Sequence, residues 1–145
     1  MSSSHAVILT LNYLHNQLKI NKIHHVAIIC SNYEASKRFY SEILGFSIKK
    51  ETYRAERASY KLDLMLNEEY IIELFSFPNS PPRSTRPEAL GLRHLAFEVD
   101  NLDEAIAYLE KNSINTEGVR IDEITNKRFT FFNDPDNLPL EFYEK

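Results

Sequence analysis

Hydrophobic residues in the first half of the chain change their spacing several times, and each change predicts an element. Residues 23–30 form an apolar run typical of a strand. Ser31 or Asn32 can cap a following helix, whose first turn holds Glu34. Apolar residues at helical spacing continue to Gly45, a residue type that ends helices in the left-handed conformation. Three further strand-like runs cover residues 46–53, 58–65 and 70–77.

The second half repeats this order of one strand, one helix and three strands. Residues 93–99 are strand-like, and Asp100 or Asn101 can cap a helix with two acidic residues in its first turn. The last two strand-like runs are separated by a turn at residues 134–137. The second half has three strand-like runs after its helix, over residues 116–122, 128–133 and 138–143. Together the halves predict an α+β fold of two βαβββ modules.

A proline-rich segment separates the halves. Four of the six prolines lie between Phe77 and Gly91, where hydrophobic periodicity is lost, which is typical of a linker or a lid. We expect an N-terminal extension over residues 1–21, forming a packing helix or a poorly ordered segment. It lacks the positively charged start and cleavage site of a signal peptide. A single domain is expected over residues 22–145, with module one at 22–77, the linker at 78–91 and module two at 92–145.

The two modules match at the positions that carry chemistry. A shift of 69 residues places His25 on His94. The same shift places Glu73 one residue past Glu141, so one deletion in the second module aligns them. Each module therefore has a histidine on its first strand and a glutamate on its last, 48 and 47 residues apart.

Each of these four residues interrupts an apolar run. Strand alternation places His25 on one face with Ala27 and Ile29, and His24 on the other face, outside the candidate set. Taken singly, such a histidine is usually a surface residue or a satisfied core residue, and such a glutamate can pair with a nearby arginine. Burying two ionised carboxylates requires a compensating charge. One divalent cation held by two imidazoles and two carboxylates supplies it, with zinc, nickel or cobalt favoured and iron or manganese as alternatives.

The amino-acid composition excludes several classes of function. The 145 residues carry a net charge of −4 without a basic block, which argues against nucleic acid or an anionic membrane as partners. No apolar run approaches the roughly 18 residues of a membrane helix. Three glycines exclude a glycine-rich phosphate loop, and the single Cys30 excludes an intramolecular disulfide. These features indicate a cytoplasmic protein that acts on a small molecule.

A set of short motifs runs through residues 22–145 in a fixed order. They are His25-Val-Ala-Ile, Phe39-Tyr40, Leu44-Gly45-Phe46, Ile72-Glu73-Leu74, Arg93-His94-Leu95-Ala96-Phe97, Asp134-Pro135-Asp136 and Leu140-Glu141-Phe142. Together they resemble the vicinal oxygen chelate superfamily, which includes glyoxalase I, fosfomycin-resistance proteins, bleomycin-resistance proteins and extradiol dioxygenases. The stretch from residue 72 to residue 94 is especially similar to a bacterial, YaeR-like branch.

The resemblance implies a cleft of curved sheets around one divalent metal, and a homodimer whose sites often draw on both chains. The glyoxalase I ligands carry over onto His25, Glu73, His94 and Glu141. Retention of Glu73 favours a lyase or isomerase over a dioxygenase. The implied mechanism is proton transfer through a metal-bound enediolate, with Glu141 as first choice for the base and Glu73 as second.

Two departures argue against glutathione as the thiol. Ile29 and Phe77 stand where glutathione-dependent glyoxalase I has an arginine and an asparagine. We therefore expect a lactoylglutathione-lyase-like enzyme acting on a small hydroxy-carbonyl compound or another thiol adduct. The alternatives are a fosfomycin-type metal-dependent thiol transferase and a non-catalytic protein that binds a metal or ligand.

Five residues are candidates for substrate contact. Clustered arginines can bind a carboxylate or phosphate through two hydrogen bonds, although ordinary solvated surface charge is the more usual explanation of each one. Tyr143 joins them because it shares a strand face with Glu141. The arginine candidates are Arg83, Arg86, Arg93 and Arg128.

Overall fold

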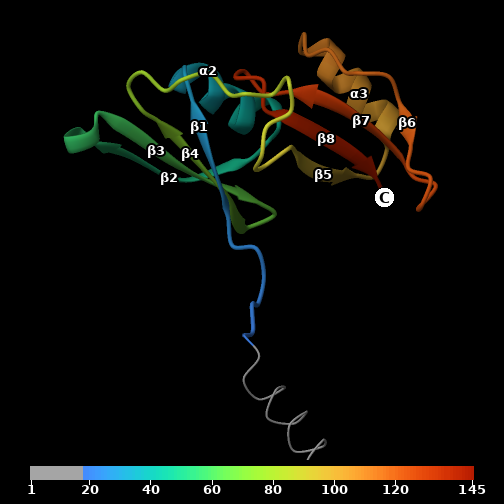
Figure 1. Ribbon diagram of the computed structural model, residues 1–145, viewed down its shortest axis with the longest axis horizontal. Coiled ribbons are helices and arrows are strands. Elements are labelled where there is room, and N and C mark those ends of the chain that lie inside the picture. Colours follow the sequence, from blue (N-terminus) through green and yellow to red (C-terminus); the bar gives the residue numbers. More distant parts are fainter. Residues whose placement is uncertain (1–17) are drawn as a thin grey trace, which may run out of the picture.

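The first half of the chain forms a mixed four-stranded sheet with one helix on its surface (Figure 1). The computed structural model describes residues 18–145, so most of the helix expected within residues 1–21 lies outside the described residues. The strand order is β1-β4-β3-β2, with β1 parallel to β4 and the other pairs antiparallel. The elements are β1 (Val26–Cys30), α2 (Tyr33–Arg38), β2 (Ser47–Arg54), β3 (Ser59–Leu66) and β4 (Glu69–Ser76).

The second half forms a second sheet with the same connectivity. Its strand order is β5-β8-β7-β6, with β5 parallel to β8. The elements are β5 (Leu95–Val99), α3 (Leu102–Lys111), β6 (Arg120–Ile121), β7 (Arg128–Asn133) and β8 (Pro139–Glu144). The predicted α+β fold of two βαβββ modules is confirmed. No helix within residues 18–145 is long and apolar enough to cross a membrane.

Asparagine side chains begin both helices. The Asn32 side-chain oxygen accepts a hydrogen bond from the Ala35 N–H, and Asn101 does the same for Glu104, each at 3.0 Å. These caps satisfy backbone donors that have no partner inside a helix. The first helix differs from the expectation at its other end, because α2 continues as a π-helical turn over Phe39–Ile43 before Gly45 reverses the chain.

Two strand boundaries also differ from the expectation. β1 and β5 begin one residue after His25 and His94, so both histidines precede their strands. The strand expected over residues 116–122 is reduced to β6. Gly118 interrupts this segment, and glycine weakens strand pairing because it has no side chain to pack.

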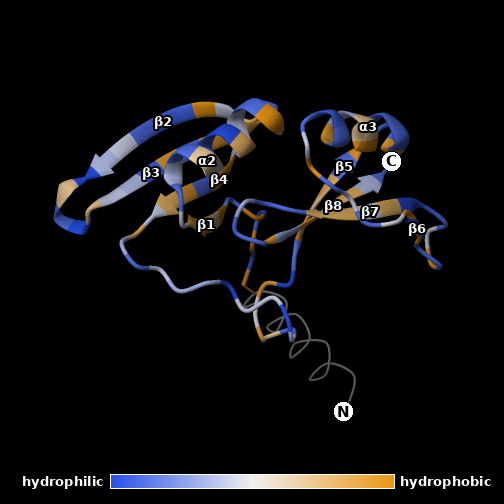
Figure 2. Ribbon diagram, turned by 90° about the horizontal axis from the view of Figure 1, so that it is seen from above, coloured by the Kyte–Doolittle hydropathy of each residue, from blue (hydrophilic) through white to orange (hydrophobic). Residues whose placement is uncertain are grey.

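The helices cover one face of each sheet and leave the other face open (Figure 1). In β1, Ile28 and Cys30 are buried, whereas Ala27 and Ile29 are exposed on the face without a helix. The most deeply buried side chains on the covered face of the first sheet include Leu62, Leu64, Ile72 and Leu74. Figure 2 shows that β2, at the outer edge, is mainly hydrophilic, in keeping with its exposure.

A buried carboxylate fastens the two modules to each other. Asp134 accepts hydrogen bonds from the Tyr40 hydroxyl at 2.7 Å and from the N–H groups of Asp136 and Leu138 at 2.8 and 2.9 Å. Asp136 in turn accepts a hydrogen bond from the Ser31 N–H at 3.0 Å. Burial raises the pKa of Asp134, so its ionised form depends on these donors. The turn at residues 134–137 therefore joins module two to module one.

Removal of the Tyr40 hydroxyl tests this contact between the two modules. Tyr40→Phe leaves the buried Asp134 carboxylate short of one donor, so we expect the free energy of unfolding to fall by about 1–3 kcal/mol. Urea denaturation at pH 7 measures the change. The matched control is Tyr53→Phe at an exposed position, and equal stability of both variants would contradict the assignment.

Candidate functional site

The first histidine–glutamate pair forms across the parallel strands of module one. His25 precedes β1, and the register of β1 with β4 sets Ala27 opposite Glu73. The His25 Nε2 lies 3.3 Å from the Glu73 Oε2. The His25 side chain is about one third exposed and that of Glu73 is 15% exposed. The pair is therefore accessible from the open face of the sheet.

The second pair forms in the same way in module two. His94 precedes β5, and the register of β5 with β8 sets Ala96 opposite Glu141. The His94 Nε2 lies 2.9 Å from the Glu141 Oε2, and the Glu141 side chain is 11% exposed. The His94 and Phe131 rings pack nearly perpendicular to each other, with their centroids 5.1 Å apart.

The carboxylate of the first pair is held by two further donors. Lys61 Nζ lies 3.0 Å from the Glu73 Oε1 and 3.2 Å from Asp63, and the Tyr70 hydroxyl donates to the same Glu73 oxygen. Burial tends to raise the pKa of Glu73, but the hydrogen bonds from Tyr70 and Lys61 outweigh it and lower that pKa. One oxygen of Glu73 is thus occupied by donors, and the other faces His25.

The imidazole of His25 contacts a neighbour that the sequence pattern excluded. His24 Nδ1 lies 2.9 Å from His25 Nδ1, so one of these nitrogens donates to the other. The expectation that His24 faces away is wrong, because strand alternation does not apply before Val26, where β1 begins. This contact orients the His25 ring and leaves its Nε2 directed at Glu73.

The second carboxylate is less constrained. Within residues 18–145, the structure gives Glu141 no side-chain donor other than His94. The two glutamates of the repeat therefore have equivalent positions but unequal surroundings. Lys61 and Tyr70, which produce the difference, were not among the residues predicted for the site. The sequence signal for Lys61 was its place as one of two charged residues, with Asp63, in the strand-like run over residues 58–65.

The two pairs do not come together within the described chain. Residues 18–145 contain no group of three or more His, Cys, Asp or Glu side chains arranged to hold a metal ion. The set of four metal ligands stays a prediction. Each pair nevertheless offers one imidazole nitrogen and one carboxylate oxygen, which are donors that zinc, nickel and cobalt accept.

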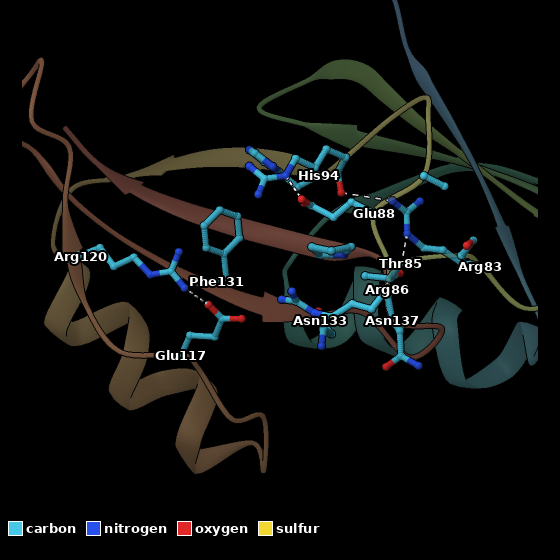
Figure 3. A pocket seen from close by; sticks show the side chains of 14 residues that line it. Arg83, Thr85, Arg86, Glu88, His94, Glu117, Arg120, Phe131, Asn133 and Asn137 are labelled. Atoms are coloured by element: carbon cyan, nitrogen blue, oxygen red, sulfur yellow. Dashed lines mark hydrogen bonds and ion pairs between the residues drawn. The ribbon is translucent and has the colours of Figure 1, made fainter.

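A cavity of about 460 Å³ adjoins the second pair (Figure 3). It lies between module two and the proline-rich segment, and His94 forms part of its wall. Its other charged and aromatic lining residues are Arg83, Arg86, Arg93, Arg120, Glu88, Glu117 and Phe131. Three of the five predicted substrate residues therefore meet in one place.

Two of these arginines hold the proline-rich segment in position. Arg83 donates to the carbonyl oxygens of Leu92 and Arg93 at 2.7 and 3.2 Å and to the Thr85 hydroxyl at 2.9 Å. The Arg93 guanidinium forms an ion pair with Glu88. These bonds tie one end of the segment to the other.

The remaining two predicted substrate residues lie away from this cavity. Arg128 binds Glu144 at 2.8 Å and Asp103 at 3.2 Å. The Tyr143 hydroxyl donates to Asp122 at 3.1 Å. Neither residue lines the cavity, whereas Arg120, which was not predicted, does. Arg120 has no counterpart in the first module and belongs to no motif, so the sequence pattern contained no signal for it.

The fold and the paired histidines and glutamates define the class of protein. The chain belongs to the Glyoxalase/Bleomycin resistance protein/Dioxygenase superfamily, whose family model matches residues 22–142. It is 63% identical over 126 residues to the uncharacterized protein YwkD of Bacillus subtilis (strain 168), covering 87% of this chain and 98% of that protein. It is 57% identical over 128 residues to the uncharacterized protein YaeR of Escherichia coli (strain K12), covering 88% and 99%.

Solved structures agree with this assignment. The crystal structure of the glyoxalase family protein from Enterococcus faecalis has a TM-score of 0.81 at 50% identity, over 86% of this chain and 98% of that one. A fosfomycin resistance protein, FosX, from Listeria monocytogenes shares the fold with a TM-score of 0.66 at 15% identity, over 88% and 95%. The trypanothione-dependent glyoxalase I of Leishmania major also shares it, with a TM-score of 0.66 at 20% identity, over 86% and 87%.

The hydrogen bonds of Arg83 generate a prediction about the proline-rich segment. Arg83→Met removes three donated bonds, so we expect chymotrypsin to cleave at the exposed Leu90 and Leu92 about tenfold faster than in the unaltered protein. Limited proteolysis followed by mass spectrometry measures the rate. The control Arg57→Met alters an exposed arginine outside this segment. Unchanged cleavage in Arg83→Met would show that these bonds do not hold the segment.

Proposed function

We propose that this protein is a metal-dependent glyoxalase-like lyase or isomerase that moves a proton between adjacent carbons of a small hydroxy-carbonyl compound or thiol adduct. The observation that carries the proposal is the repeated His–Glu pair on the open face of each sheet. Members of the superfamily commonly bind a divalent metal and commonly act as dimers that bind small molecules. A catalytic cation of the zinc, nickel or cobalt class fits the donors of both pairs.

We further propose that the metal is held between two copies of the chain in a homodimer. Each pair alone supplies only half of the expected donors, and residues 18–145 of one chain hold no larger cluster. In a twofold dimer, His25 and Glu73 of one subunit meet the partner's His94 and the partner's Glu141, and the symmetry produces two equivalent sites. The proposed location of this small-molecule enzyme is the cytoplasm.

The unequal surroundings of the two glutamates support different roles. A cation held by the two pairs would withdraw charge from the substrate oxygens and so make a neighbouring carbon-bound proton more acidic. Glu141, whose carboxylate is the less constrained, accepts this proton and returns it to the adjacent carbon. Glu73 remains an ionised anchor, because Lys61 and Tyr70 bind its Oε1 and leave Oε2 beside His25.

The open face also supports a substrate other than a glutathione adduct. Ile29 is 54% exposed on the same face as His25, at a position where glutathione-dependent relatives carry an arginine. An isoleucine offers no donor for a glutathione carboxylate. The thiol or hydroxy-carbonyl compound must therefore make its polar contacts elsewhere in the site.

Metal analysis of glutamine variants tests the ligand set. We expect about one divalent ion per chain in the unaltered protein, and Glu73→Gln and Glu141→Gln should each weaken metal binding at least about tenfold because a charged ligand is lost. Dialysis against mixed divalent metals and elemental analysis provide the measurement. Glu56→Gln, at an exposed site outside both pairs, is the control. A metal-free unaltered protein under every condition would refute the proposed activity.

Mixing two defective variants tests whether the site is shared. His25→Gln and His94→Gln should each fail to retain metal when purified alone. Co-expressed, about half of the dimers are mixed, and each mixed dimer has one intact site, so about a quarter of the metal capacity should return. Elemental analysis and dimer mass measurement read the result. If the mixture retains no metal while dimers form, the ligands belong to one chain.

A further inference from the structure

The cavity beside His94 has a charge opposite to that of the whole chain. The chain carries a net charge of −4, yet four arginines and two glutamates line this one cavity, a surplus of two positive charges. A concave surface with this surplus attracts anions. Figure 3 shows Arg86 and Arg120 extending into the cavity, one from the proline-rich segment and the other from β6.

Only two of the four arginines are available to a ligand. Arg83 and Arg93 are engaged by the backbone and by Glu88, as described above. Arg86 has no ion-pair or side-chain hydrogen-bond partner anywhere in the part of the chain that the structure describes. Its guanidinium carries five donors in a planar arrangement that matches a carboxylate or phosphate.

Arg120 is held by a contact that a ligand can replace. Its guanidinium lies 2.5 Å from the Glu117 carboxylate, but both side chains are about half exposed. Exposed ion pairs contribute little free energy, so exchanging Glu117 for another anion costs little. The same guanidinium lies 5.6 Å from the centre of the Phe131 ring, which keeps it directed toward the cavity.

The position of Phe131 limits the distance from this anion site to the proposed metal ligand. The ring centres of His94 and Phe131 are 5.1 Å apart, and the Arg120 guanidinium carbon lies 5.6 Å from the same Phe131 centre. The His94 ring and the Arg120 guanidinium are therefore at most about 11 Å apart. A small molecule, from a compound of a few carbons up to a small thiol adduct, is long enough to span this distance.

We infer that Arg86 and Arg120 bind an oxyanion of the substrate, a carboxylate or a phosphate, while the hydroxy-carbonyl end lies toward His94. The substrate class is then an anionic hydroxy-carbonyl compound or an anionic thiol adduct. The role of the bound anion as part of a substrate rests on the proposed function. The binding of the anion itself rests only on the cavity.

Anion titration of the metal-free protein tests this inference. Inorganic phosphate and pyruvate are titrated separately in the presence of EDTA at constant ionic strength, with binding followed by isothermal calorimetry or by amide NMR shifts. We expect saturable binding, weakened at least about tenfold by Arg86→Gln and by Arg120→Gln, since each loses charged hydrogen bonds. The exposed Arg57→Gln is the control for a change in net charge.

A gain-of-binding variant separates this role from a structural one. Glu117→Gln releases Arg120 from its ion pair, so anion binding should become several-fold tighter, an effect that damage to the fold does not produce. The anion that binds with the higher affinity, phosphate or pyruvate, indicates whether the substrate carries a phosphate or a carboxylate. Absence of binding for both anions, or equal weakening by Arg57→Gln, overturns the inference.

The result of the anion titration is independent of the result of the metal analysis. Anion binding by a protein that retains no metal supports the cavity and refutes the proposed enzyme. Metal retention without anion binding supports the enzyme and overturns this substrate class. Because the titration uses metal-free protein, neither result depends on the other.

Discussion

The parallel pairing of the first and last strands of each module is the constraint on which the site depends. A parallel pair requires a long crossover connection, and here the helix and two strands of the module supply it. Neighbouring strands lie about 4.8 Å apart, so a histidine just before the first strand reaches a glutamate in the last. The registers Ala27–Glu73 and Ala96–Glu141 produce the same geometry twice.

Equivalent positions in the repeat do not have equivalent electrostatics. Glu73 lies beside Lys61 and Tyr70, which satisfy one of its oxygens, whereas His94 alone accompanies Glu141 within residues 18–145. The hydrogen bonds from Tyr70 and Lys61 lower the pKa of Glu73 against the opposing effect of burial. This difference in surroundings is the basis for the separate roles proposed for the two glutamates.

The proline-rich segment serves the second pair by forming the opposite wall of its cavity. The bonds from Arg83 to the carbonyl groups of Leu92 and Arg93 close this segment into a loop beside His94. A second attachment comes from Thr85, whose hydroxyl donates to the Asn137 carbonyl at 3.0 Å, in the turn that joins the modules. The contacts that hold the modules together therefore also shape the cavity.

By itself, the sequence determined the α+β class, the two βαβββ modules and the repeated histidine and glutamate positions, because strand and helix periods and the repeat are local or regular patterns. It narrowed each helix cap to two adjacent residues, and the structure selects the asparagine in both cases. Only the tertiary structure decided which charges surround each glutamate and which arginines line the cavity. Arg128 and Arg86 look alike in sequence, yet Arg128 is engaged by Glu144 and Asp103, while Arg86 lines the cavity. Partners distant in the chain make this difference, and hydrophobic periodicity contains no information about them.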